Sequence, residues 1–410
     1  MEAVNAQAGP RMVGPTLAPR DDAPRALPFR AGAFEVLSHL GRGGMAELYR
    51  ARTADGELAV IKEVAAELAS QQRFQSLLMG ESRLTGLLDH PNVIRVLGEG
   101  HLDDGQPFIA FEYVEGLDLR QLLKRCTARR IGLPIKHALT IVTSVLRALD
   151  HAHRARDLSG ERLDAVHRDI SPSNVLLGFD GSVRLCDFGI ATSRVMPEVP
   201  GGTIEGKAGY MSPEHAAGAP VDARADLYAA GILLWELLHG RRMRKKKNDN
   251  PMSLLAAARE AEVPVFVVRG LPHEEELHAI IRRALERDRE DRYASAAAML
   301  TDLDRYARAA GLMGSEAELA AWLGECFPEE RAKQRALREA LLGAPEVDLD
   351  ATPSSPAVHR PSVISGPRRI QRSVAPTQEK RTASDLVFIG AMACAATLSV
   401  LGALSAFGWF

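Results

Sequence analysis

The sequence predicts an α+β fold followed by a membrane-spanning helix at the C-terminal end. Three observations support this prediction. Apolar segments typical of strands occur at residues 34–40 and 58–62, and residues 227–238 form an apolar run typical of a buried helix. Residues 386–410 contain no charged side chain. The length of 410 residues predicts one large domain of about 250–300 residues with appendages.

Composition excludes several classes of protein. Hydrophobic residues make up 46% of the chain and charged residues 25%, which is enough apolar material for a packed core. The net charge is -2 and aromatic residues are 5%, so no nucleic-acid partner is expected. Four cysteines lie far apart, which indicates a reducing compartment and no disulfide framework: Cys126, Cys186, Cys326 and Cys394.

The ends of the chain differ in composition from its middle. Residues 1–33 are proline-rich without an apolar run, which predicts a flexible N-terminal tail and no signal peptide. The body is predicted at 34–308. Residues 309–343 form a short extension with two amphipathic helices broken near Pro328. Residues 344–385 are rich in Pro, Ser and Arg, as in a juxtamembrane linker.

The uncharged segment 386–410 is long enough to cross a membrane. As a helix it would extend about 37 Å, against a hydrocarbon core of about 30 Å. A buried core helix is the alternative, but the scattered small polar residues of the segment define no polar face. The flanking residues 351–384 contain six Lys or Arg and one acid. This asymmetry predicts a single-pass protein of the cell membrane with its body in the cytoplasm.

A glycine cluster follows the first predicted strand. Glycines let the backbone turn tightly and approach a polyphosphate, whose oxygens accept main-chain N–H bonds. A plain β-turn is the alternative for such a cluster taken alone. The segment comprises Leu40, Gly41, Arg42, Gly43, Gly44, Met45, Ala46, Glu47 and Leu48.

Lys62 ends an apolar strand, where a lysine is costly unless its ammonium is paired or snorkels to water from a sheet edge. Glu81 in the following helical pattern is a candidate partner, and such a pair could hold phosphates. Further along, two loops bounded by apolar strands carry Asp169, Asn174 and Asp187. Asn174 and Asp187 offer the hard oxygens that Mg²⁺ prefers, and Asp169 could orient a hydroxyl and accept its proton.

These motifs, together with Tyr210–Glu214, resemble the eukaryotic-like serine/threonine protein kinase family in its bacterial membrane-anchored form. The HRDxxxxN, DFG and PE motifs occur in the family's order, and the resemblance covers about 34–308. It implies a two-lobed fold, with a small antiparallel β lobe carrying one helix and a large helical lobe. ATP and Mg²⁺ would bind between the lobes, and protein substrates would receive the γ-phosphoryl group.

The resemblance also implies roles for single residues. Residues 40–48 would cover the phosphates, Lys62 and Glu81 would hold them, Asp169 would be the catalytic base, and Asn174 and Asp187 the metal ligands. Further implied positions are the gatekeeper Phe111, the adenine hinge with Glu112 and Val114, the ribose-binding Asp118, the adenine-contacting Val60 and Leu176, and the structural pair Glu214–Arg292.

One departure concerns the charge at the transferred phosphoryl group. The family places a lysine two residues after the catalytic aspartate, or an arginine two positions further on, and this chain has Ser171 and Ser173 there. The family's threonine seven residues before Glu214 is replaced by Lys207. We interpret this as a swap in which the Lys207 ammonium supplies the missing cation. Two unrelated losses are the alternative.

The remaining expectations concern regulation and partners. Thr203 lies at the family's spacing for an activating phosphosite, which Arg168 would bind. The basic run 241–247 is predicted to be an exposed loop. A nucleotide-binding pseudokinase scaffold and a membrane-tethered adaptor are the alternative functions. The protein substrate and upstream signal are not predicted, and a homodimer stays open as a partner.

Overall fold

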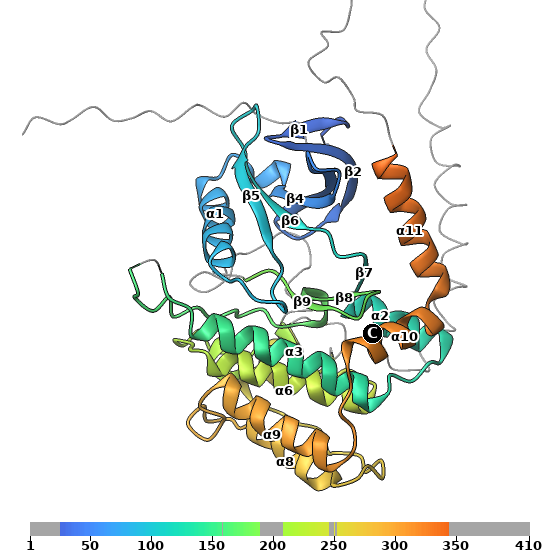
Figure 1. The fold of residues 1–410 in the computed structure, drawn as a ribbon. Helices are drawn as coiled ribbons and strands as arrows, with labels where there is room; N and C mark the ends of the chain where they lie inside the picture. The colour runs from blue at the N-terminus through green and yellow to red at the C-terminus, as the bar shows by residue number, and fades with distance from the viewer. Residues whose placement is uncertain (1–24, 158, 189–207, 246–249, 251, 344–410) are drawn as a thin grey trace, which may run out of the picture. The chain divides into compact units, whose positions relative to one another are not determined.

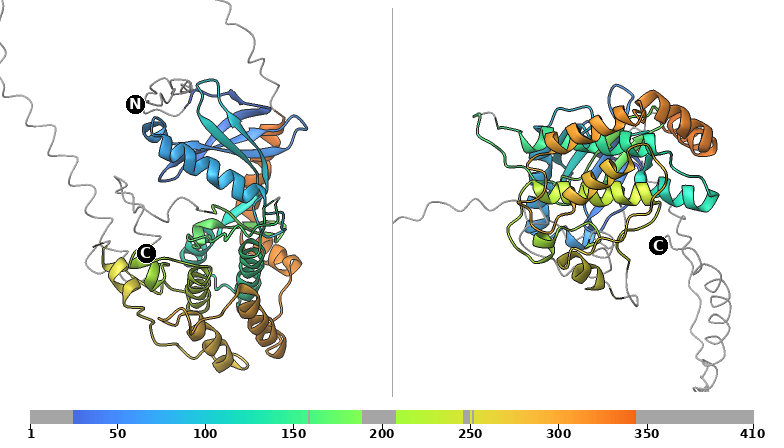
Figure 2. Two further views of the ribbon diagram at one scale, coloured as in Figure 1. Left: turned by 90° about the vertical axis from the view of Figure 1, so that its left-hand side faces the viewer. Right: turned by 90° about the horizontal axis from the view of Figure 1, so that it is seen from below.

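The computed structural model describes residues 25–157, 159–188, 208–245, 250 and 252–343. Within these residues a small β-rich lobe is followed along the chain by a larger helical lobe, as the predicted α+β class requires (Figures 1 and 2). The candidate segment 386–410, the linker 344–385 and most of the N-terminal tail lie outside the described residues. No helix among the described residues is long and apolar enough to cross a membrane.

The small lobe is an antiparallel sheet with the strand order β1-β2-β3-β4-β6-β5. Its strands are β1 (Phe29–Ala31), β2 (Phe34–Arg42), β3 (Ala46–Arg52), β4 (Leu58–Val64), β5 (Val96–His101) and β6 (Pro107–Glu112). Strand β4 is paired along both sides, with β3 and with β6. A residue of β4 therefore lies in the middle of the sheet and not at an edge.

The single long helix of this lobe packs on the sheet. Helix α1 (Gln72–Gly86) follows a short 3₁₀ turn, η1 (Ala66–Leu68), and buries Phe74 and Leu78 against β4 and β6. Apolar residues of β4 and β6, including Val64 and Ile109, complete the same core cluster. This packing sets the distance between α1 and the central strand, and Glu81 lies on the buried side of the helix.

A second, three-stranded sheet lies where the lobes meet. It has the order β7-β8-β9, with β7 (Gly116–Asp118), β8 (Val175–Gly178) and β9 (Val183–Leu185). The 3₁₀ turn η2 (Pro172–Asn174) leads directly into β8. The loops before β8 and after β9 carry the polar residues that the sequence singles out.

The large lobe is built around two buried helices. Helix α6 (Arg224–His239) is apolar on nearly all sides, and α3 (Ile135–His153) packs beside it and α9 (Figure 1). The other helices of the described residues are α2 (Leu119–Arg129), α5 (Pro213–Ala216), α7 (Met252–Arg259), α8 (Glu274–Ala284), α9 (Ala296–Ala309), α10 (Glu316–Cys326) and α11 (Pro328–Leu342). Pro328 is the first residue of α11, so the break between the last two helices lies where the sequence indicates.

The boundary of the N-terminal tail at residue 33 is wrong. Strand β1 pairs with β2, and the Phe29 ring meets the Tyr49 ring edge-on at 5.4 Å. The Arg25 guanidinium pairs with Glu63 at 3.0 Å and with Asp104 at 2.6 Å. A three-residue strand has too short a pattern to be recognised from sequence, although its partner β2 begins only three residues after it ends.

Gly181 allows the extension to approach the three-stranded sheet. It has φ +85° in the turn between β8 and β9, and a Cβ there would lie 1.9 Å from the Glu316 carbonyl oxygen at the start of α10. Gly181→Ala should therefore lower the free energy of unfolding by about 2–3 kcal/mol, because backbone strain and a steric clash add together.

Gly56→Ala provides the matched control for this prediction. Gly56 has φ +78° with open space around it, so that variant carries the strain alone and should lose about 1 kcal/mol. Denaturant unfolding of both variants measures the difference. Equal losses would show that α10 does not hold its place against the turn.

Candidate active site

A lysine shared by two carboxylates lies at the centre of the site. Lys62 is in β4, opposite Leu48 of β3 and Ile109 of β6. Its ammonium donates to Glu81 of α1 at 2.8 and 2.9 Å and to Asp187 at 2.7 Å. The alternative of an exposed lysine at a sheet edge is therefore wrong, because β4 is central and the side chain is 13% exposed.

Two negative charges and one positive charge meet in this partly closed space. Burial works against the charged form of Lys62, but Asp187 and Glu81 outweigh it and raise its pKa above the usual value. Burial raises the pKa of Glu81 from 4.5 to about 7, and Asp187 adds to this while Lys62 opposes it. The Asp187 carboxylate is 44% exposed and faces the open side of the site.

Asp169 and Asn174 form the second part of the site. The Asn174 amide donates to the Asp169 carboxylate at 2.9 Å and to the Asp169 carbonyl at 2.8 Å. With its nitrogen used in this way, the amide oxygen has only a long contact among the described residues, from the Ser173 hydroxyl at 3.4 Å. The turn η2 therefore fixes the Asp169 carboxylate and leaves an amide oxygen available as a ligand.

Buried Asp226 at the start of α6 holds the loop before Asp169. Its carboxylate accepts the backbone N–H of His167 at 2.8 Å and that of Arg168 at 2.7 Å. Burial works against its charged form, but His153 and His167 outweigh it and lower its pKa. Arg168 has φ +65°, a conformation that is strained for a residue with a Cβ and needs such support.

His167 connects the two loops. Burial lowers its pKa, which favours the neutral ring. The ring then donates from Nε2 to the Cys186 carbonyl at 3.0 Å and accepts the Asp169 N–H at Nδ1 at 3.2 Å. Phe188 is fully buried with its ring 4.6 Å from that of His167, so the residues on both sides of Asp187 are held.

Apolar residues expected around an adenine ring converge on one cluster. Val60, Val114 and Leu176 are each half-buried and pack on the core cluster that contains buried Phe111. They come from β4, from the segment between β6 and β7, and from β8. Cys186 joins them, and burial raises the pKa of its thiol well above the usual value. The thiol is therefore a packing group and not a nucleophile.

Two of the expected nucleotide-contacting acids have structural partners. The Glu112 carboxylate accepts the Arg95 N–H at 3.0 Å and pairs with Arg184 at 3.2 Å. Both contacts use the same carboxylate oxygen, Oε1, so this side chain is held by structural partners. Asp118 caps α2 by accepting the Gln121 N–H at 2.7 Å, and burial raises its pKa. Its second carboxylate oxygen is the part that could reach a ribose.

The glycine-rich segment is a hairpin turn between β2 and β3. Gly43 donates to the Ala46 carbonyl at 2.8 Å, and both Gly43 and Gly44 are exposed. Buried Glu47 pairs with His39 at 2.7 Å and with Arg42 at 3.3 Å. Arg42 also pairs with Glu67 in η1. Charged pairs beside the turn thus hold its base while its tip is open.

The family's cation is absent at Ser171 and Ser173, and no other cation replaces it in the described part of the loop that contains these two residues. Ser171 is buried, and its hydroxyl lies 3.0 Å from that of Ser173. Lys207 and the phosphosite candidate Thr203 lie outside the described residues.

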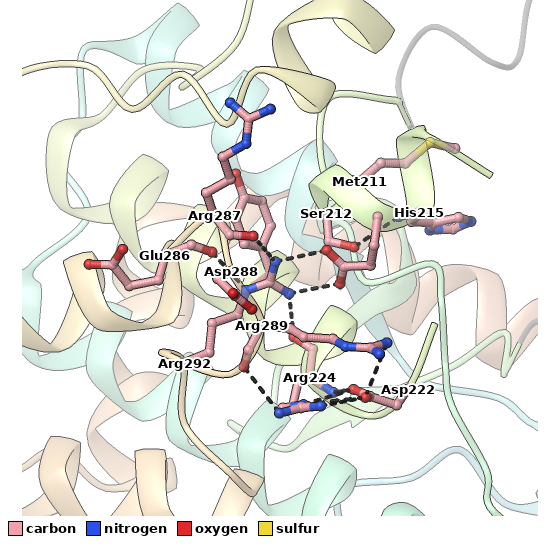
Figure 3. Close-up of polar contacts among 12 residues, drawn as sticks. Met211, Ser212, His215, Asp222, Arg224, Glu286, Arg287, Asp288, Arg289 and Arg292 are labelled. Atoms are coloured by element: carbon pink, nitrogen blue, oxygen red, sulfur yellow. Dashed lines mark hydrogen bonds and ion pairs between the residues drawn. The ribbon is translucent and has the colours of Figure 1, made fainter. Parts of the chain in front are cut away.

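An ion pair anchors the segment that follows the undescribed residues 189–207. Arg292 is fully buried and donates to both oxygens of Glu214 at 2.8 Å, as expected (Figure 3). Burial raises the pKa of Glu214, but Arg292 outweighs this and the net shift is downward. Asp222 and Arg224 form a second pair at 2.9 Å, and the Arg224 carbonyl accepts a bond from Arg292 at 3.4 Å (Figure 3).

The prediction of an exposed basic loop at 241–247 is wrong for its middle. Arg244 is 7% exposed and donates to the Met211 carbonyl at 2.8 Å and the Tyr228 hydroxyl at 2.6 Å. Arg242 pairs with Glu236, which accepts the Tyr210 hydroxyl at 2.5 Å. The arginines therefore hold residues 209–211 in place. The sequence shows this segment only as a run of like charges and does not indicate its role at residues 209–211. It likewise does not indicate that Asp226 holds the loop before Asp169.

Removal of the Glu81 charge should change the pH dependence of stability. Because the pKa of Glu81 is raised to about 7 in the folded chain, its contribution to stability is present below 4.5 and is lost as pH rises through about 7. Glu81→Gln removes this loss. The difference in thermal midpoint, variant minus wild type, should thus be larger at pH 8 than at pH 5. Each ~1 kcal/mol of stability that wild type loses by ionising Glu81 corresponds to about 2–4 °C.

Scanning calorimetry at the two pH values measures this difference. Exposed Glu99→Gln is the charge-matched control and should show the same offset from wild type at both pH values. An offset for Glu81→Gln that is also equal at pH 5 and pH 8 would contradict the raised pKa of Glu81.

Comparison with known proteins agrees with this geometry. The model of the protein kinase domain family matches residues 34–303. The tyrosine-protein kinase MasK of Myxococcus xanthus is 35% identical over 313 residues, 74% of this chain and 48% of that protein. The serine/threonine-protein kinase PrkC of Bacillus subtilis is 32% identical over 276 residues, 67% of this chain and 40% of that protein. The chain thus matches less than half the length of either relative.

Solved structures show the same likeness. The crystal structure of the Mycobacterium tuberculosis PknI kinase domain is 28% identical, with a TM-score of 0.52, and covers 70% of this chain and 100% of that one. A family match over most of the body and relatives above 30% identity agree with the arrangement of Lys62, Glu81, Asp169, Asn174 and Asp187. The chain belongs to the protein kinase domain family.

Proposed function

We propose that the chain is a serine/threonine protein kinase that transfers the γ-phosphoryl group of ATP to protein hydroxyls with Mg²⁺. One observation carries the proposal: Lys62 bridges Glu81 and Asp187 at 2.7–2.9 Å while Asn174 holds the Asp169 carboxylate at 2.9 Å. A pseudokinase scaffold or a membrane-tethered adaptor would need no positioned Asp169, so the geometry favours the enzyme.

The donor set fits a magnesium ion together with a nucleotide. The half-exposed Asp187 carboxylate and the Asn174 amide oxygen are hard ligands, and Mg²⁺ keeps its remaining positions for phosphate oxygens and water. Among the described residues no group of three His, Cys, Asp or Glu forms a complete protein site for a metal. When bound, the ion would neutralise phosphate charge.

The chain's own residues would do the rest. Lys62, kept charged and fixed by Glu81, would hold the phosphates. Asp169 would orient the attacking hydroxyl and accept its proton, and the Asn174 amide keeps its carboxylate aimed. Catalysis would rest on orientation and charge and not on a covalent intermediate.

The proposal that serine and threonine are the acceptor residues rests on the segment 210–214. Tyr210–Glu214 resembles the substrate loop of serine/threonine members, and Arg244 holds its backbone at the Met211 carbonyl. The relatives carry both names, since MasK is named a tyrosine-protein kinase and PrkC a serine/threonine-protein kinase. Phosphoamino-acid analysis of the reaction product decides between them.

Substitutions in the site should abolish transfer and leave the fold intact. Asp169→Asn, Lys62→Met and Asp187→Asn should each lower transfer from labelled ATP by at least about a hundredfold, because each removes a charge that acts at the reacting groups. Asp187→Asn should also weaken Mg²⁺-dependent ATP binding, since an amide is a poorer ligand for a hard cation. Thermal midpoints of the full chain check the fold.

Exposed Asp103→Asn in the turn between β5 and β6 is the charge-matched control and should transfer at the wild-type rate. Near-normal transfer by Asp169→Asn would contradict the enzyme proposal and favour the pseudokinase scaffold.

Phosphopeptide mapping of the same reactions tests Thr203 as the autophosphorylation site, and a fully active chain that is unmodified there would exclude it.

We also propose that Lys207 supplies the cation missing at Ser171. Lys207→Ala should then lower the rate of transfer about a hundred- to a thousandfold with little change in ATP affinity, because the charge matters most as the phosphoryl group moves. Ser171→Lys in a Lys207→Thr background should recover much of the loss, and Ser171→Lys alone should help little. Single-turnover rates of these three variants and of Lys207→Thr alone measure this, and additive effects would contradict the swap.

Attachment to the membrane is the last part of the proposal. Residues 386–410 would anchor the chain with the kinase domain on the cytoplasmic side, as the six basic residues of 351–384 indicate. Protease added outside intact spheroplasts should leave the domain uncut, and cleavage would reverse the orientation.

A further inference from the structure

Helix α11 runs along both lobes of the domain. It starts beside α2 in the large lobe, passes β7 and ends near the small-lobe sheet (Figure 1). Four of its positions, spaced four residues apart on one side of the helix, contact the rest of the domain: Glu330, Gln334, Arg338 and Leu342. The sequence shows this segment only as an amphipathic helix.

The lower end of the helix is anchored in the large lobe. Glu330 pairs with Arg125 at 3.2 Å and with Arg129 at 2.7 Å, both on α2, and its side chain is only 12% exposed. The preceding helix α10 buries Leu319 and Leu323 in the large lobe. The start of α11 is therefore fixed by an apolar anchor and a half-buried ion pair.

The middle of the helix meets the hinge between the lobes. The Tyr113 hydroxyl donates to the Gln334 side-chain oxygen at 2.5 Å, and the Gln334 amide donates to the Gly116 carbonyl at 3.3 Å. One turn further, Arg338 pairs with Glu115 at 3.4 Å. A single amide thus contacts Tyr113, just after β6, and Gly116, the first residue of β7, on the two sides of the hinge.

The upper end reaches the strands that carry the glycine-rich turn. The Arg52 guanidinium of β3 donates to the Leu342 carbonyl at 3.3 Å and pairs with Glu35 of β2 at 2.5 Å. Carbonyls at the end of a helix lack intrahelical partners, so this cation satisfies one of them. The helix therefore contacts the large lobe, the hinge and the small lobe in turn.

The identified attachments of α11 are hydrogen bonds and ion pairs, and the leucines of its second half are half-buried. No residue of α11 is buried, in contrast to α10. The Arg338–Glu115 pair is exposed, and exposed ion pairs contribute little free energy of folding, so this contact adds less to stability than to the relative orientation of the parts it joins. A rigid helix with three polar attachments suits the control of lobe orientation.

We propose that Gln334 is a positioning residue for the nucleotide site, which it serves by fixing the hinge through Tyr113 and Gly116. This inference rests on the proposed function, since it concerns the same site. When the hinge is loosened, the two lobes sample orientations in which Lys62 and Val60 above do not face Leu176 and Asp187 below. The apparent nucleotide affinity falls in proportion to the fraction of chains that are competent to bind.

Gln334→Ala in the full chain tests the proposal. A hydrogen-bonded group of this kind is worth about 1 kcal/mol, so the Kd for Mg–ATP should rise about three- to tenfold in isothermal titration. KM for ATP should rise by a similar factor, while kcat changes less than twofold. Gln334→Glu keeps the acceptor for Tyr113 but loses the donor to Gly116. The Kd of this variant should therefore lie between those of the wild type and Gln334→Ala.

Arg335→Ala is the matched control. Arg335 is on the same helix, is 78% exposed, and pairs with Glu339 of α11 at 3.1 Å. Its removal should leave Kd, KM and kcat unchanged. Tyr113→Phe removes the same hydrogen bond from the hinge side, so Tyr113→Phe and Gln334→Ala together should weaken binding by less than the product of their separate effects.

The outcomes are distinguishable. A wild-type chain that binds no Mg–ATP overturns the proposed function, and this inference with it. If the wild type binds and Gln334→Ala binds equally well, the proposed function stands and the positioning role is excluded. A lowered thermal midpoint with unchanged Kd would assign Gln334 a purely structural role, and independent effects of Gln334→Ala and Tyr113→Phe would exclude their coupling.

Discussion

The rest of the site depends on one ammonium group shared by two carboxylates. Lys62 is held in the middle of the small-lobe sheet and bonds to Glu81 of α1 and to Asp187 beyond β9. A buried charge is stable only when paired, and here the pairing requires three elements to meet within about 3 Å. The position of α1 against β4 is therefore constrained by electrostatics as well as by apolar packing. The Lys62–Asp187 bond also constrains the position of the small lobe relative to the loop after β9.

Backbone support is the second constraint, and it comes from residues that contact no substrate. Asp187 and Arg168 both have left-handed backbone conformations, with φ +59° and φ +65°. Asp226 accepts the N–H groups of His167 and Arg168, and the neutral His167 ring spans the two loops. The Asp169 carboxylate is thus aimed by a chain of buried hydrogen bonds that ends in the apolar helix α6.

The extension after the large lobe has a different character. Helix α10 is part of the packed core, whereas α11 makes its contacts through Glu330, Gln334 and Arg338 with no buried residue. Polar contacts of this kind contribute more to orientation than to stability, since water competes for each of them. Because Gln334 and Arg338 lie along the hinge, the last helix of the described residues contacts the segment that carries Val114.

Sequence alone determined the α+β class and the kinase motifs, because short motifs carry fixed chemistry at fixed spacing, and the family resemblance of these motifs implied the Lys62–Glu81 and Glu214–Arg292 pairs. It did not reveal strand β1, the buried role of Arg244 or the part of Gln334 at the hinge. Strand β1 is too short to show a pattern, and the other two roles depend on partners distant along the chain, 33 residues away for Met211 and Arg244 and 221 for Tyr113 and Gln334. Local pattern reports periodicity and residue type, while only the packed tertiary structure decides which polar groups meet.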